Sequence, residues 1–170
     1  MTIHSDHPFL DDPDSWDPVR RFRGRLSSPV TIITSGEEGR WAGLTVSSLM
    51  VIEGEPGQVR AVVGPSTDLW YALEPGGRLI VHVCSERHRS LAETFAGLRP
   101  SPGGMFTGLD ITQTDWGPVI EDLPNRAYCT VETRREAGFS GIMTAMIDRV
   151  EVVDLADPLT YFRGSYHGLG

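Results

Sequence analysis

Hydrophobic positions in this chain gather in short runs that are separated by turn residues. Six such runs, rich in valine, isoleucine and threonine, are residues 30–35, 41–48, 59–63, 79–84, 127–135 and 141–153. Short apolar runs bounded by glycine and proline predict β-strands. A parallel doubly wound sheet would need a helix after almost every strand, and the chain offers only two or three helical stretches. We therefore predict a mainly β fold, an antiparallel barrel with a few peripheral helices.

The first 14 residues are polar and acidic, and they predict a flexible arm outside the packed domain. One domain is expected to span residues 15–170. It begins with a short helix that Ser15 could cap and that ends before Pro29, because the residue before a proline avoids the helical conformation. Three apolar residues recur at helical spacing in this helix: Val19, Phe22 and Leu26.

Two further helices and a long loop are predicted between the strands. Residues 68–74 form one helix, and the other follows Ser85, with Leu91 and Phe95 on one face. Residues 100–118 are rich in proline and glycine and predict a long irregular loop. Loops of this length inside a compact domain often carry function.

Charge and composition exclude several functions. The net charge is −8 and no basic stripe is present, so neither nucleic acid nor an anionic membrane is an expected partner. All fifteen basic residues are arginine. Schiff-base catalysis, a lysine-anchored pyridoxal cofactor and a Walker-type phosphate loop are excluded, because each needs a lysine. A bound phosphate must be held by arginine, hydroxyl or backbone N–H groups.

Cys84 and Cys129 each lie within an apolar run, without the paired spacing of a disulfide or metal site. They are predicted to be buried, reduced thiols of a cytoplasmic protein. His82, in the same run as Cys84, is expected to be a structural residue with satisfied hydrogen bonds. The N-terminus lacks the basic and apolar segments of a secretion signal, and residues 79–84 are too few to span a bilayer.

The strongest candidate for chemistry is a pair of hydroxyl-rich segments. The first is Thr45-Val46-Ser47-Ser48, within a predicted strand, and the second is Gly64-Pro65-Ser66-Thr67, between a strand and a helix. A hairpin would place them side by side, and their donors, with the start of the helix, could hold a phosphate. The alternatives are a solvent-facing edge strand for the first segment and a simple helix cap for the second.

Three other residues are candidates for the same pocket. Arg99 follows a predicted helix and could supply a fixed positive charge, although it could equally complement the helix dipole. Phe95 and Trp70 could stack on a planar ring, and the alternative for both is the hydrophobic core. No Gly-x-Ser-x-Gly elbow and no Gly-x-Gly-x-x-Gly motif occurs, so neither a serine hydrolase nor a separate dinucleotide-binding domain is supported.

Five motifs follow one another along residues 19–166. They are Val30-Thr31-Ile32-Ile33-Thr34-Ser35, Gly43-Leu44-Thr45-Val46-Ser47-Ser48-Leu49, Ser66-Thr67, Leu91-Ala92 with Phe95-Ala96-Gly97, and Asp157-Pro158-Leu159 with Tyr161-Phe162 and Gly164. In this order and spacing they resemble the flavin reductase family of FMN-binding split barrels. The resemblance implies a homodimer of Greek-key barrels in which residues 45–48 and 64–67 hold FMN, or FAD, near the subunit interface. It also implies NADH or NADPH as the electron donor, and a monooxygenase as a partner that receives the reduced flavin.

The chain departs from this family at a late hairpin and in the phosphate loop. Many members carry Gly-Asp-His at the hairpin, and the histidine helps to bind flavin or nicotinamide; the matching residues here are Gly138-Phe139-Ser140. The phosphate loop also has Pro65 and Leu69 where a basic residue and a further hydroxyl are common. The resemblance leads to the hypothesis of an NAD(P)H-dependent FMN reductase. The departures leave an alternative, a flavin storage or carrier protein without efficient NAD(P)H turnover. A barrel for a deazaflavin or haem is a third possibility, and haem is disfavoured because no histidine falls in the proposed pocket.

Overall fold

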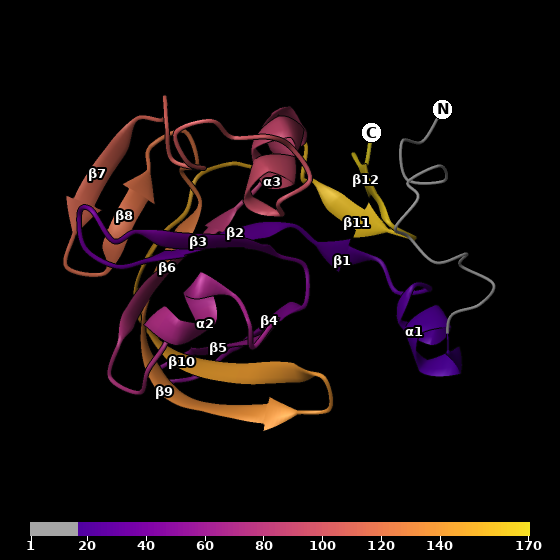
Figure 1. Ribbon diagram of the computed structural model, residues 1–170, viewed down its shortest axis with the longest axis horizontal. Coiled ribbons are helices and arrows are strands. Elements are labelled where there is room, and N and C mark those ends of the chain that lie inside the picture. The colour runs from indigo at the N-terminus through magenta and orange to yellow at the C-terminus, as the bar shows by residue number, and fades with distance from the viewer. Residues whose placement is uncertain (1–16) are drawn as a thin grey trace.

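A computed structural model describes residues 17–170 of the chain (Figure 1). The predicted arm over residues 1–14 and the cap at Ser15 lie outside the described residues. The helices are α1 (Pro18–Arg23), α2 (Asp68–Ala72) and α3 (Arg89–Phe95), and a 3₁₀ turn, η2 (Glu86–His88), leads into α3. The strands are β1 (Ser28–Pro29), β2 (Thr31–Ser35), β3 (Ala42–Val46), β4 (Leu49–Ile52), β5 (Gln58–Val63), β6 (Arg78–Val83), β7 (Ile111–Thr114), β8 (Gly117–Ile120), β9 (Arg126–Ala137), β10 (Ser140–Glu151), β11 (Thr160–Phe162) and β12 (Ser165–His167).

Seven of the strands form one curled antiparallel sheet, in the order β3-β2-β6-β9-β10-β5-β4. The two edge strands, β3 and β4, follow one another in the chain and are joined by Ser47 and Ser48 alone. The chain from Val46 to Leu49 makes three Cα–Cα steps and spans at most about 10 Å, so the edges of the sheet must come together at this dipeptide, and Figure 1 shows the resulting curl. The predicted mainly β, barrel-like fold is confirmed.

The interior of the curled sheet is one apolar core. It contains Ile33, Val59, Leu79, Val131 and Met143, one from each of five strands. Helix α2 lies within the curve of the sheet (Figure 1) and adds three buried residues to this core, namely Leu69, Trp70 and Leu73. The barrel is therefore filled by side chains, and a ligand must bind at its rim or on its outer face.

A second core lies on the outer face of β2, beneath α3. Ile32 and Phe95 are buried there with Leu159, which comes from the segment before β11. The short sheet β1-β11-β12 extends this layer, because Ser28 pairs with Tyr161. The C-terminal hairpin is thereby held against the beginning of the barrel.

Several boundaries differ from the sequence predictions. Helix α1 ends at Arg23 rather than near Pro29, and its N-cap is Asp17, whose Oδ1 accepts hydrogen bonds from the backbone N–H groups of Val19 and Arg20 at 2.9 and 3.0 Å. The predicted irregular loop over residues 100–118 contains strand β7, which pairs with β8. The predicted strand over residues 41–48 ends at Val46, because closure of the sheet breaks it there.

His82 is the structural residue that the sequence predicted. Its ring is fully buried on β6, where Nδ1 lies 3.1 Å from the carbonyl oxygen of Ile32 and Nε2 accepts a hydrogen bond from the backbone N–H of Ile120 at 3.1 Å. Since Nε2 accepts, Nδ1 carries the proton of the neutral ring and donates it to Ile32. Burial lowers the pKa of His82 from 6.5 to about 3, so the ring is neutral in the folded protein.

The lowered pKa predicts an acid-sensitive contribution to stability. Below pH 6.5 the unfolded chain binds a proton at His82 that the folded protein refuses until about pH 3, so the free energy of unfolding falls as the pH falls through this window. The slope from this one group reaches about 1.4 kcal/mol per pH unit. Urea unfolding of the protein and of His82→Gln between pH 7 and pH 4 measures it. The substituted protein should be less stable at pH 7 but lose less stability on acidification; parallel pH profiles would contradict the assignment.

Candidate functional site

Strand register brings the two hydroxyl-rich segments to one end of neighbouring strands. Strands β4 and β5 form the predicted hairpin, with Leu49 opposite Ala61, and the backbone N–H of Val62 donates to the carbonyl oxygen of Ser48 at 2.9 Å. Residues 47–48 precede β4 and residues 64–67 follow β5, so both segments lie at the open end of this hairpin. The site consists of the ends of these two chain segments.

The late hairpin of β9 and β10 reaches the same end of the barrel. Gly141 of β10 pairs with Val63 of β5, so Ser140 lies beside the start of the segment at Gly64. Phe139, at the turn of the hairpin, is fully exposed and buries no part of its ring against residues 17–170. The segment at Gly138-Phe139-Ser140 thus adjoins the hydroxyl-rich site, with a serine next to it and an aromatic ring beyond it.

The hydroxyl groups of the site fall into two classes. Thr45 Oγ1 donates to the carbonyl oxygen of Ala92 on α3 at 2.6 Å, and Thr67 Oγ1 donates to the carbonyl oxygen of Gly64 at 2.7 Å. Thr67 is also the N-cap of α2, because its Oγ1 accepts from the backbone N–H of Trp70 at 3.2 Å. Both threonines therefore have structural roles. Three serine hydroxyls have no hydrogen-bond partner among residues 17–170 and are free to bind a ligand: Ser47, Ser48 and Ser66.

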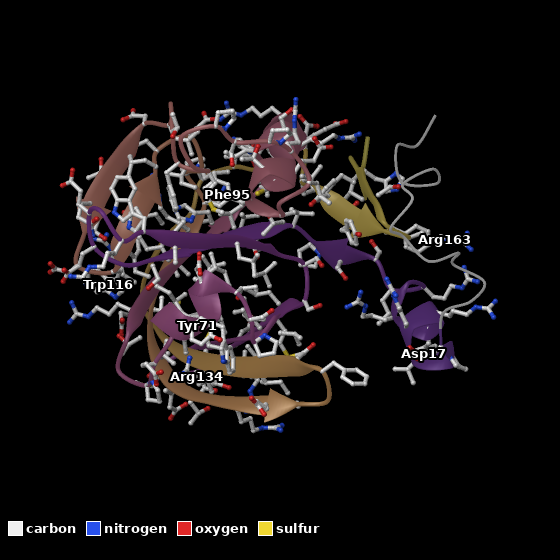
Figure 2. All side chains as sticks on the ribbon, viewed as in Figure 1. Asp17, Tyr71, Phe95, Trp116, Arg134 and Arg163 are labelled. Atoms are coloured by element: carbon white, nitrogen blue, oxygen red, sulfur yellow. The ribbon has the colours of Figure 1, made fainter. Side chains whose placement is uncertain are left out.

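Three candidate residues lie in the core instead of facing a ligand. Val46 is buried in the barrel interior. Phe95, a candidate for stacking on a ring with the core as its alternative, is buried on the inner side of α3, and its ring meets that of Phe106 edge to face with centroids 5.0 Å apart (Figure 2). Gly43 makes room for it, since a Cβ there would lie 2.6 Å from the Phe95 ring. Trp70 packs on Gly141 in the same way, with the Arg134 guanidinium 4.9 Å from the ring centroid.

Arg99 forms an ion pair near the end of α3. Its side chain is half exposed, and Nη1 lies 3.5 Å from Oε2 of Glu93 on α3. This ion pair with a residue of α3 is a contact that neither the ligand role nor the helix-dipole role predicted for Arg99. The proposed helix-dipole cradle is also weak, because α2 has five residues and begins with Asp68.

A hollow of about 260 Å³ opens beside Ser47, on the outer side of β3. It is lined by Arg23, Thr45, Ser47, Ala96, Leu98, Tyr161 and Tyr166. The two tyrosine rings meet edge to face, with centroids 5.2 Å apart. Burial raises the pKa of Tyr166, with smaller contributions from Tyr161 and Glu93, so its phenol stays protonated and can donate a hydrogen bond. Aromatic walls with a few polar groups suit a planar heterocycle.

Sequence reasoning missed the residues that come to this hollow from distant parts of the chain. Arg23 comes from α1, and both tyrosines come from the hairpin of β11 and β12, more than a hundred residues away from β3. The motif around Tyr161 and Gly164 was the available signal, because it belongs to the family resemblance although it has no hydroxyl cluster of its own.

A second hollow, of about 200 Å³, lies beside Ser85 and His88. Ser85 Oγ is 2.8 Å from His88 Nδ1, and His88 Nε2 is 3.2 Å from Oδ2 of Asp122, an arrangement like that of a hydrolytic triad. However, Nδ1 also accepts the backbone N–H of Ser85 at 3.0 Å. The Nδ1 lone pair that would accept the serine proton is thus occupied by a backbone hydrogen bond of the capping box at the start of η2. We therefore assign Ser85, His88 and Asp122 a structural role.

Comparison with known proteins gives consistent results. Residues 23–170 match the family model described as "Flavin reductase like domain". The chain is 27% identical over 157 residues to the flavin-dependent monooxygenase reductase subunit HsaB of Rhodococcus jostii, covering 90% of this chain and 78% of that protein. It is 28% identical over 149 residues to the FMN reductase (NADH) RutF of Variovorax paradoxus, covering 87% and 82%. The solved structure of flavin reductase PheA2 superposes with a TM-score of 0.79 at 25% identity, covering 91% of this chain and 99% of that one. No helix within residues 17–170 is long and apolar enough to cross a membrane.

Proposed function

Because the chain belongs to the flavin reductase-like family, we propose that it binds FMN, or FAD, at the rim of the barrel and reduces it with NADH or NADPH. One observation carries the proposal: the Ser47-Ser48 dipeptide connects the aromatic hollow with the hydroxyl-rich segment at residues 64–67. Ser47 lines the aromatic hollow, and Ser48 is bonded to β5 just before the segment at residues 64–67. A flavin could therefore place its ring in the hollow and its phosphate at the free serines.

The side chains present fit this ligand. The hollow offers two aromatic rings, the apolar Ala96 and Leu98, and a protonated phenol, which suit a planar ring with a polar edge. The unpartnered hydroxyls of Ser47, Ser48 and Ser66 suit a phosphate in a chain that has no lysine. The fit rests on these hydroxyls, because α2 has only five residues and therefore a small dipole, and the negative charge of Asp68 in its first turn opposes a bound phosphate.

When bound, the flavin itself supplies the redox chemistry by accepting a hydride from the nicotinamide. The protein's part is to hold the two ring systems in contact and to exclude competing reactions, and it needs no general acid or base for this step. For that reason we assign binding residues and no catalytic residue.

The relatives suggest where the reduced flavin goes. HsaB and the 4-hydroxyphenylacetate 3-monooxygenase reductase component of Pseudomonas aeruginosa, which is 25% identical over 156 residues, are named as reductase components of monooxygenases. We propose that this protein likewise delivers reduced flavin to a monooxygenase. Both cysteines are free and buried, which agrees with a cytoplasmic enzyme.

A homodimer is part of the proposal. On β5, Val59, Ala61 and Val63 face the core, so Val62 faces outward, where it is paired with Ile142 of β10. Met50 and Ile52 of β4 are exposed beside it, 60% and 38% accessible. The exposed Arg60 of β5 lies opposite Met50 on this face, so a second copy would cover a patch of apolar side chains with one basic residue within it, next to a sheet edge.

Light scattering at micromolar concentration should therefore give a dimeric mass. The double substitution Met50→Asp and Val62→Asp should yield a folded monomer, because charged side chains would be buried in the interface. Val150→Asp is the matched control, since Val150 is exposed on the part of β10 that pairs with β9 alone. A monomeric mass for the unsubstituted protein would contradict the dimer.

The reductase activity is tested by mixing the protein with NADH or NADPH and excess FMN or FAD without oxygen. Bleaching of the flavin absorbance, with one nicotinamide oxidised per flavin, is the expected result. Flavin binding without bleaching by either donor would instead indicate the storage or carrier alternative.

A further inference from the structure

Arg23 is the single charged residue among those that line the aromatic hollow. We propose that its guanidinium makes this site favour reduced flavin over oxidised flavin. The inference rests on the proposed function, because it assumes that the flavin ring occupies the hollow.

The side chain of Arg23 is free for such a role. No ion pair or hydrogen bond of this side chain is found within residues 17–170, whereas Arg99, the other arginine near the end of α3, is paired with Glu93. A guanidinium is planar and weakly hydrated, so it can approach an aromatic edge at small cost. Among residues 17–170, a charged group therefore borders the hollow without a counter-ion.

The backbone holds Arg23 near the tyrosines. Its carbonyl oxygen accepts a hydrogen bond from the backbone N–H of Leu26 at 3.1 Å, which extends the turn beyond α1. Two residues later Ser28 begins β1 and pairs with Tyr161 of β11. The position of α1 at the β1 side of the molecule is visible in Figure 1. Arg23 is thus connected to a wall of the hollow by a short, bonded stretch of chain.

The chemistry of flavin gives this charge a consequence. Reduction by two electrons with uptake of one proton leaves the ring system with one negative charge, and the nicotinamide becomes cationic as it gives up the hydride. A fixed positive charge beside the ring stabilises the reduced form more than the neutral oxidised form. The phosphate is proposed to lie at the free serines, and of these only Ser47 lines the hollow, so the ring is the part of the ligand that Arg23 meets.

The test compares Arg23→Gln with Arg21→Gln, which removes the same charge from the same short helix but lies outside the hollow. Dissociation constants for oxidised FMN are measured by fluorescence quenching, and those for dithionite-reduced FMN by anaerobic titration. We expect Arg23→Gln to weaken the binding of reduced FMN about tenfold more than the binding of oxidised FMN. This difference lowers the midpoint potential of bound flavin by about 30 mV for a two-electron couple. Arg21→Gln should leave the ratio unchanged.

Two results would overturn the inference while the proposed function stands. Equal losses for oxidised and reduced FMN, with riboflavin unaffected, would place Arg23 at the phosphate. Unchanged affinities for both forms would show that the guanidinium does not reach the ligand. If the unsubstituted protein binds neither form, the proposed function fails together with the inference. Melting curves of both variants establish that they fold, which their exposed positions lead us to expect.

Discussion

Replacing Ser47, Ser48 and Ser66 together by alanine is expected to weaken FMN binding by about 100-fold. The three hydroxyls have no partner within the described residues, so their removal leaves no buried group unsatisfied and costs little stability. Each hydroxyl that donates to a charged phosphate contributes on the order of 1 kcal/mol, and three contribute about 3 kcal/mol. Riboflavin, which lacks the phosphate, should lose less than about threefold.

Equilibrium titrations of the triple variant with FMN and riboflavin measure this difference directly. Ser90→Ala is the control, because Ser90 is an exposed serine of α3 remote from residues 47–48 in sequence. An equal loss of affinity for FMN and riboflavin would place the serines at the flavin ring. An unchanged affinity for FMN would show that the serines do not contact the ligand.

The second large effect concerns the hairpin turn at Gly138-Phe139-Ser140. The double substitution Phe139→Asp and Ser140→His restores the pattern of the family that this chain resembles, next to the strand end at Gly64. One histidine contact to a bound nicotinamide is worth on the order of 1 to 3 kcal/mol. The second-order rate with NADH should therefore rise roughly tenfold to a hundredfold, while the FMN affinity stays similar.

Stopped-flow reduction of FMN at subsaturating NADH measures that rate. Phe139→Ala separates the two changes: Phe139 is fully exposed in this chain, so removing its ring alone should alter the rate little. An unsubstituted protein that already reduces FMN at about 10 per second would show that the departure has no functional consequence, and it would also exclude the storage alternative.

The barrel was predictable because its strands are apolar and locally delimited. In runs such as residues 79–84 nearly every side chain is apolar and buried. Such a run predicts a strand even when its partner strands are unknown. Strand β4 was not predicted, although Leu49–Ile52 is apolar, because the break at Ser47-Ser48 is set by the meeting of two sheet edges. Strand β7 was hidden within a segment rich in proline and glycine, where pairing with β8 decides the conformation.

The candidate site was predictable only in part, for a related reason. Hydroxyl clusters at Ser47 and Ser66 can be read from a few neighbouring residues, but whether a hydroxyl is free depends on what lies opposite. Thr45 and Thr67 were indistinguishable from the serines until their carbonyl partners were known. Phe95 was assigned to a ligand and lies in the core, because Gly43 leaves space for its ring there.

The charge of the site shows the same limit. Arg99 was the natural candidate from its place after a helix, yet it pairs with Glu93. Arg23 lines the hollow because the pairing of β1 with β11 brings α1 to the C-terminal hairpin. Contacts between such distant segments depend on the topology of the sheet, which no local pattern in the sequence encodes.

Equilibrium titration of the purified protein with FMN, FAD and riboflavin tests the central claim most directly. The proposed site predicts saturable binding of FMN or FAD with a dissociation constant below about 10 μM, and weaker binding of riboflavin because it lacks the phosphate. Absence of binding by all three ligands at tens of micromolar, which corresponds to an affinity of less than about 6 kcal/mol, would contradict it.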